Sequence, residues 1–157
     1  MRRRAAARAV ARLRRILHAT DFSTASRPAF RMAVGLAKRE GGMLLLLHVL
    51  TPPSPFSAGS GPPPSSYLEL LAATRRDARR RLATALARAR AAGIRAQAKL
   101  VEGGAAERIL RIGQRWRPDV IVIGTHGRSG VRHFLMGSVA EHVVRRASRP
   151  VLTVRAR

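Results

Sequence analysis

The chain has 157 residues, 46% of them hydrophobic and 25% charged, which is enough for one domain with a hydrophobic core. Its 31 lysines and arginines against 8 acidic residues give a formal net charge of +23, a balance that favours contact with polyanions. The absence of cysteine excludes a disulfide scaffold, a thiolate metal site and a cysteine nucleophile. No apolar run approaches the ~20 residues of a membrane span and no signal-peptide pattern is present, so we expect a soluble, cytoplasmic protein.

Residues 1–13 are predicted to form a basic N-terminal arm that precedes a single domain over residues 14–157. The first fifteen residues hold seven arginines and no acidic residue, a composition that fits a disordered arm or a frayed helix. The simplest interpretation is an exposed tail, or a start codon placed too far upstream. We assign the arm no function.

The rest of the chain alternates between strand-like and helix-like segments. Apolar runs or alternating patterns predict strands at residues 15–20, 43–50, 94–101, 119–124 and 150–154. Apolar residues at helical spacing predict one helix capped by Ser23 or Thr24 and ended by Gly41 and Gly42, and others at residues 67–92, 104–116 and 137–147. Leu68, Leu71, Leu82 and Leu86 are expected on the apolar stripe of the second of these helices.

Six of the nine prolines fall between residues 52 and 64, where we expect a mobile loop that forms neither helix nor strand. Strands that alternate with helices predict an α/β fold with right-handed crossovers. For one domain of this size we expect a single doubly wound, five-stranded parallel sheet of Rossmann-like or flavodoxin-like type, with strand order 3-2-1-4-5.

In such sheets, ligands bind beyond the carboxyl ends of the strands, where the strand order reverses. Two predicted strand ends therefore matter, residues 19–21 and residues 124–139. Within the second segment, residues 124–137 contain four glycines in fourteen residues, and backbone without a Cβ atom can approach a phosphate or ribose closely. Residues 137–139 open a helix whose free N–H groups and positive dipole end attract an anion. Each glycine alone is more simply a turn or a cap, but their joint spacing favours a ligand-binding loop.

The spacing G-x2-G-x9-G-S, between a strand and a helix, resembles the ATP-binding branch of the universal stress protein (UspA-like) family. The resemblance extends over residues 14–155. It includes the opening at residues 16–23, the pattern Leu-Leu-His-Val at residues 46–49, residues 119–127 and the ending at residues 149–154. It implies the adenine nucleotide alpha hydrolase-like form of the fold and a nucleotide-responsive regulatory or stress-survival protein.

The same resemblance implies roles for particular residues. Main chain at Ala19 and Val49 would hold adenine, and Asp21 would hydrogen-bond the ribose hydroxyls. The glycine loop would line the ribose and α-phosphate, and the start of the last helix would hold the β- and γ-phosphates. A divalent ion, Mg²⁺ or Mn²⁺, would bridge the phosphates and needs few protein ligands. The expected cofactor-binding residues are Ala19, Thr20, Asp21, Val49, Gly124, Thr125, His126, Gly127, Arg128, Ser129, Gly130, Gly137, Ser138 and Val139.

No catalytic residue is expected. The chain has no Walker-type Gly-x4-Gly-Lys-[Ser/Thr] lysine and no evident water-activating residue, so ATP hydrolysis should be slow at most. His18 and His48 stand in apolar strands and are more simply packed side chains than catalysts. Asp21 has a second interpretation as a helix cap, which its position alone leaves equally open.

Two further alternatives concern partners. The charge also fits a basic protein that binds nucleic acid nonspecifically, although six aromatic residues in the whole chain leave no stacking platform for bases. The short apolar strand at residues 150–154 is expected at a sheet edge, where it would pair with a second copy in a homodimer. Otherwise that edge stays unpaired and shielded by Arg155 and Arg157.

Overall fold

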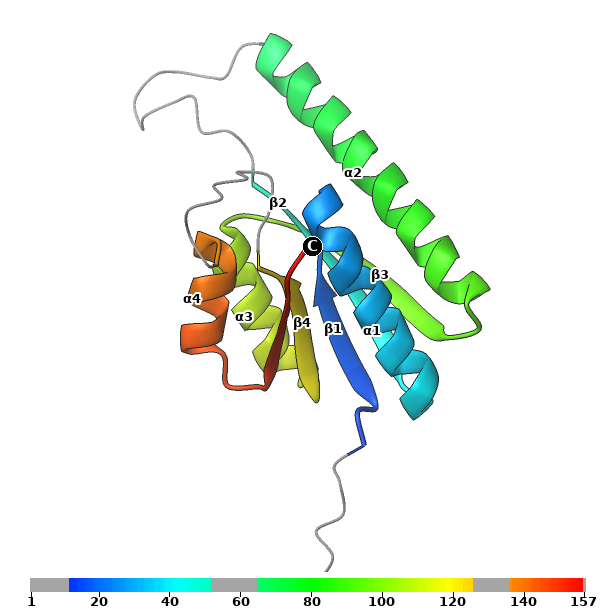
Figure 1. Ribbon diagram of the computed structural model, residues 1–157. Helices are drawn as coiled ribbons and strands as arrows, with labels where there is room; N and C mark the ends of the chain where they lie inside the picture. The colour runs from blue at the N-terminus through cyan, green and yellow to red at the C-terminus, as the bar shows by residue number, and fades with distance from the viewer. Residues whose placement is uncertain (1–11, 52–64, 126–135, 157) are drawn as a thin grey trace, which may run out of the picture.

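A computed structural model describes residues 12–51, 65–125 and 136–156. Five parallel strands form one sheet, and their order across the sheet is the predicted 3-2-1-4-5 (Figure 1). Most of the arm, the proline-rich segment and residues 126–135 of the glycine loop lie outside the described residues. In chain order the elements are β1 (Arg15–Ala19), the 3-10 turn η1 (Thr24–Ser26), α1 (Arg27–Glu40), β2 (Met43–Leu50), α2 (Ser65–Ala91), β3 (Arg95–Glu102), α3 (Ala105–Trp116), β4 (Val120–Gly124), α4 (Ser138–Arg146) and β5 (Val151–Val154).

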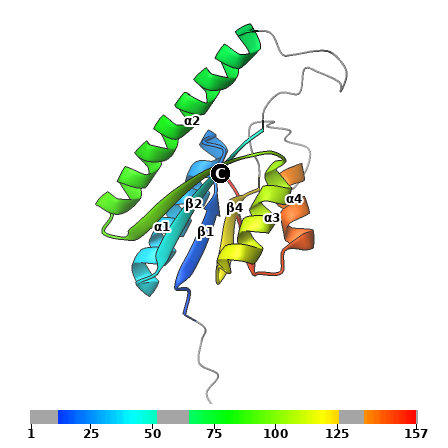
Figure 2. The same ribbon diagram turned by 180° about the vertical axis from the view of Figure 1, so that it is seen from behind.

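Helices cover both faces of the sheet, α1 and α2 on one side and α3 and α4 on the other (Figures 1 and 2). This explains the unbroken apolar run of β2, because successive side chains of a strand point to opposite faces. Leu44 and Leu46 pack toward α1 and α2, whereas Leu45 and Leu47 pack toward α3 and α4. Each fully buried leucine contributes about 1.5–3 kcal/mol relative to an exposed one.

The turn between β1 and α1 is built from short polar side chains. Ser23 caps η1 by accepting a hydrogen bond from the Ser26 N–H at 3.2 Å, and Pro28 follows in the first turn of α1. The helix ends at Gly41, whose φ of 62° is left-handed. At Gly42, an added Cβ would lie 2.5 Å from the Leu13 carbonyl oxygen, so the close approach of the chain before β1 requires glycine there.

One part of the predicted α2 stripe is wrong. Leu82 is buried, but Leu68 is 52% exposed, because the first turns of α2 extend past the end of the sheet (Figure 1).

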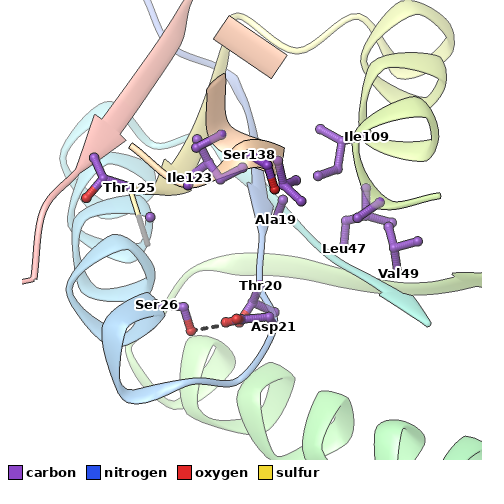
Figure 3. A pocket seen from close by; sticks show the side chains of 15 residues that line it. Ala19, Thr20, Asp21, Ser26, Leu47, Val49, Ile109, Ile123, Thr125 and Ser138 are labelled. Carbon is purple, nitrogen blue, oxygen red and sulfur yellow. Dashed lines mark hydrogen bonds between the residues drawn. The ribbon is translucent and has the colours of Figure 1, made fainter. Parts of the chain in front are cut away.

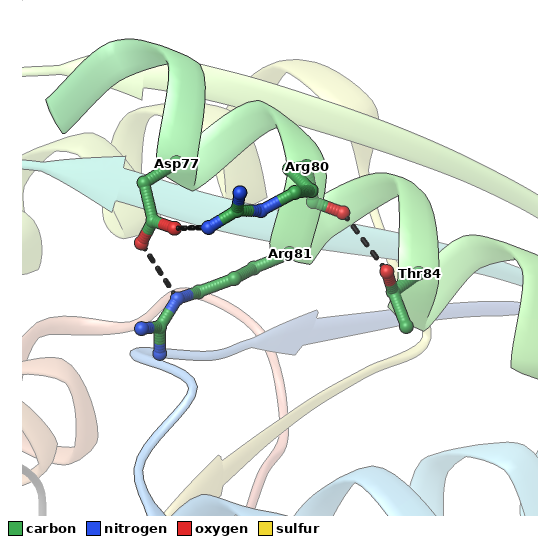
Figure 4. A network of polar contacts seen from close by, with 4 residues as sticks. All are labelled: Asp77, Arg80, Arg81 and Thr84. Carbon is green, nitrogen blue, oxygen red and sulfur yellow. Dashed lines mark hydrogen bonds and ion pairs between the residues drawn. The ribbon is translucent and has the colours of Figure 1, made fainter. Parts of the chain in front are cut away.

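Farther along α2, Arg75 donates two hydrogen bonds to Glu102 at 2.6 and 2.9 Å, and this contact lowers the pKa of the Glu102 carboxyl. On the solvent side of the helix, Asp77 accepts hydrogen bonds from Arg80 and Arg81 (Figure 4). No helix among the described residues is long and apolar enough to cross a membrane.

His18 is fully buried in β1 on the α1 side of the sheet. Its Nδ1 donates to the Val122 carbonyl oxygen at 3.1 Å, and its ring packs against Phe30. Its Nε2 has no hydrogen-bond partner in the described structure. Burial lowers the pKa of His18 from 6.5 to about 4. This position fits a packed core histidine rather than a catalyst.

The His18 pKa predicts a pH dependence of stability. A neutral ring is required in the folded state, so its stabilising effect is complete above pH 6.5 and is lost as the pH falls from 6.5 toward 4. The expected loss is on the order of 3 kcal/mol in the free energy of unfolding. Urea unfolding between pH 4 and 7 should show this slope for the wild-type protein, and a much shallower one for His18→Leu. Equal slopes in the two proteins would contradict the assignment.

Candidate functional site

A cavity of about 300 Å³ lies at the carboxyl ends of β1, β2 and β4, next to the start of α4 (Figure 3). The strand order reverses between β1 and β4, so the cavity occupies the position where doubly wound sheets bind ligands. Its volume is at the lower end of the ~300–1,000 Å³ range of small-molecule sites. The lining residues are Ala19, Thr20, Asp21, Ser26, Leu47, Val49, Ala105, Ile109, Ile123, Gly124, Thr125, Gly137, Ser138, Val139 and Ala140.

The cavity combines apolar and polar surface. Leu47, Ile109 and Ile123 supply aliphatic surface from β2, α3 and β4, which suits a flat apolar ring system. Hydroxyl and carboxylate groups come from two places, the loop after β1 and the segment that joins β4 to α4. The site can therefore hold a ligand with a flat apolar part and polar or charged substituents.

Asp21 is held in place by Ser23. Its Oδ1 accepts hydrogen bonds from the Ser23 N–H at 3.0 Å and from the Ser23 hydroxyl at 2.7 Å. Its other oxygen, Oδ2, makes no hydrogen bond with the part of the chain that the structure describes, and Asp21 lines the cavity. The helix cap itself is Ser23. Asp21 thus combines a local structural contact with a carboxylate oxygen that is available to a ligand.

The start of α4 presents backbone donors to the cavity. Gly137 is the N-cap residue in an extended conformation, and no side chain caps the helix. The N–H groups of Ser138, Val139 and Ala140 belong to the first turn, where the helix offers them no carbonyl partner. The positive end of the helix dipole adds to their attraction for anions. The Gly137 N–H donates to the Thr125 carbonyl oxygen, which fixes this turn to the end of β4.

Nine of the fourteen predicted site residues belong to this one cavity. The other five, His126, Gly127, Arg128, Ser129 and Gly130, lie outside the described residues. Six other lining residues were not predicted as site residues. Residue types such as these occur in any strand or helix, so only the folded structure shows that they reach the cavity. They are Ser26, which is 5% exposed, Leu47, Ala105, Ile109, Ile123 and Ala140. The predicted residues that line the cavity are Ala19, Thr20, Asp21, Val49, Gly124, Thr125, Gly137, Ser138 and Val139.

Residues 12–155 match the model of the universal stress protein family. A universal stress protein of Methanocaldococcus jannaschii is 30% identical over 143 residues, which are 90% of this chain and 82% of that protein. A solved structure of a family protein from Burkholderia pseudomallei is 30% identical with a TM-score of 0.72, and the match covers 93% of this chain and 99% of that one.

Other solved structures share the fold at lower identity. The universal stress protein UspA from Lactobacillus plantarum has a TM-score of 0.82 at 24% identity, covering 92% of this chain and 99% of that one. A universal stress protein from Archaeoglobus fulgidus in complex with dAMP has a TM-score of 0.64 at 22% identity, covering 92% and 100%. Another universal stress protein, in complex with cAMP, has a TM-score of 0.65 at 23% identity, covering 94% and 100%.

Proposed function

The chain belongs to the universal stress protein family, and we propose that it is an ATP-binding member that acts as a nucleotide-responsive regulatory or stress-survival protein. The observation that carries the proposal is the cavity, which joins an apolar slot, a carboxylate and a helix N-terminus within one site. Fold relatives in complex with dAMP and cAMP support a nucleotide as the ligand class. A cytoplasmic location remains an expectation from the sequence.

We propose that the adenine ring lies between the aliphatic side chains of Leu47, Ile109 and Ile123. Its polar edge would face the backbone of Val49 and Ala19, which line the same cavity. The ribose hydroxyls would donate to Asp21, through the carboxylate oxygen that Ser23 does not occupy.

The triphosphate would extend toward α4, where the first-turn N–H groups and the Ser138 hydroxyl are available. Arg128 and Arg132 of the glycine loop are proposed to add positive charge. Three or more His, Asp or Glu side chains do not gather anywhere in residues 12–51, 65–125 and 136–156. We therefore propose that Mg²⁺ or Mn²⁺ is held mainly by phosphate oxygens.

The protein is proposed to act through occupancy rather than through catalysis. Of the acidic side chains, Asp21 lines the cavity, and we assign its remaining oxygen, Oδ2, to the ribose hydroxyls rather than to an attacking water. We expect ATP hydrolysis to be slow at most. Bound nucleotide would instead order the loops around the cavity and change the surface that partners meet.

A homodimer through β5 is also proposed. This strand pairs with β4 on one side, and it is the last strand of the described sheet. Its residues Val151–Val154 are partly buried and apolar apart from Thr153, so the free edge suits pairing with a second copy.

The decisive experiment is to purify the protein in high salt, denature it and identify any released nucleotide, followed by calorimetry of the emptied protein with Mg-ATP. ATP or ADP released at about one per chain, or saturable ATP binding, is the expected result. An empty protein that gives no heat with ATP would contradict it. If that protein retained oligonucleotides more strongly as salt falls, nucleic-acid binding would replace the proposal.

Asp21→Asn tests the ribose contact. The asparagine oxygen can still accept from Ser23, so the turn should persist, while the charged acceptor for the ribose is lost. Loss of a hydrogen bond to a charged group costs about 1.5–3 kcal/mol, so ATP affinity should fall roughly 10- to 100-fold. Tripolyphosphate, which has no ribose, should bind at least as well as before. Calorimetry with both ligands measures the difference.

Glu69→Gln is the matched control, because it removes one negative charge from an exposed position on α2. It should leave both affinities unchanged. Equal losses of ATP and tripolyphosphate affinity in Asp21→Asn would show that Asp21 supports the fold of the loop and does not contact the ribose.

A further inference from the structure

We propose that His48 is a positioning residue that keeps the backbone of Val49 open toward the cavity. The His48 ring forms a hydrogen bond with the carbonyl oxygen of Thr20, with which the Val49 N–H would otherwise pair. The role of the freed backbone in binding the base rests on the proposed function, but the effect of His48 on the strand does not.

The hydrogen bonds between β1 and β2 follow the regular parallel pattern as far as Thr20. The Met43 N–H donates to the Arg14 oxygen at 2.7 Å, and the Thr20 N–H donates to the Leu47 oxygen at 2.9 Å. In a parallel ladder, the residue that donates to one partner accepts from the residue two positions farther along that strand. The Thr20 oxygen should therefore accept next from the Val49 N–H.

That bond is replaced by a side chain. His48 Nδ1 lies 2.7 Å from the Thr20 carbonyl oxygen. A carbonyl oxygen only accepts, so Nδ1 carries the proton and donates. The His48 ring is 5% exposed and packs against the Phe22 ring with centroids 4.4 Å apart, which holds the donor in position.

The carbonyl oxygen of Val49 also loses its expected partner on the β1 side to a side chain. Continuing the ladder would bring the Phe22 N–H to the Val49 carbonyl oxygen. Instead the Phe22 N–H donates to Thr20 Oγ1 at 3.1 Å, and the left-handed φ of 61° at Phe22 turns the chain away from β2. The orientation of the Thr20 hydroxyl is fixed by Ser26. The Ser26 hydroxyl donates its proton to the Ser23 carbonyl oxygen, so it accepts a hydrogen bond from the Thr20 hydroxyl.

Two side chains, from His48 and Thr20, thus end the ladder one step early. Val49 lines the cavity, and its N–H and C=O on the β1 side find no partner among the described residues. A neighbouring donor and acceptor complement the edge of a base that offers a bare ring nitrogen beside an amino group. Val49 is partly buried, so leaving these polar groups unpaired costs free energy, and a ligand that pairs them gains affinity.

The test compares two variants. His48→Leu removes the donor, so the Val49 N–H should close onto the Thr20 oxygen. His48→Asn is the matched control, because its amide nitrogen can donate where Nδ1 did. In nucleotide-free protein, hydrogen exchange by NMR should be fast at the Val49 amide for the wild type and for His48→Asn. It should be at least about tenfold slower for His48→Leu, with the Leu47 amide as an unchanged internal reference.

Calorimetry measures the effect of the same variants on ligand binding. ATP affinity should fall at least about tenfold in His48→Leu and recover in His48→Asn, whereas tripolyphosphate affinity should stay the same in both. Slow exchange of the Val49 amide in the wild type, or unchanged exchange in His48→Leu, would overturn the role of His48. Wild-type protein that binds no ATP would overturn the proposed function, and the exchange comparison would still decide the role of His48. His48→Met, which also lacks a donor, serves the same purpose if the leucine variant does not fold.

Discussion

The early end of the hydrogen-bond ladder between β1 and β2 is the constraint on which the site depends. Up to Thr20 the two strands satisfy each other, and beyond it the chain turns away through Phe22. The cavity opens at this divergence, beside the reversal of strand order between β1 and β4. Backbone that stops pairing with its own sheet becomes available to a ligand, so one structural event creates both the space and the polar groups.

The buried sheet makes this arrangement rigid. Helices cover both faces, so β2 and β4 are apolar on both sides and their ends have little freedom to shift. The first turn of α4 is tied to β4 through Gly137 and Thr125, and Thr125 is tied to β5 through Val154. The apolar slot of the cavity and the backbone donors at the start of α4 are therefore held in fixed relation by the same sheet.

The sequence predicts most of this architecture because its signals are local. The apolar runs place each strand to within one residue at either end, and Gly41 ends α1 where expected. The fold type and the glycine spacing indicate the strand ends and the start of α4, and the family resemblance implies the individual cavity residues there. Ser26, Ile109 and the bond from His48 to Thr20 could not be predicted, since they depend on how distant segments meet. The prediction that Leu68 packs on the apolar stripe of α2 was wrong for a related reason, because the spacing of apolar residues in a helix does not reveal where the sheet beneath it ends.

The central claim is that a base edge pairs with the Val49 backbone while the phosphates meet α4. The most direct measurement is an NMR titration of assigned amides with Mg-ATP and, separately, with Mg-inosine triphosphate, which presents a carbonyl and an N–H where adenine has an amino group and a bare nitrogen. The account predicts that ATP shifts the amides of Val49, Ser138 and Val139, whereas inosine triphosphate shifts those of α4 and leaves Val49 largely unmoved. A Val49 amide that ignores ATP, or that responds equally to both nucleotides, would contradict it.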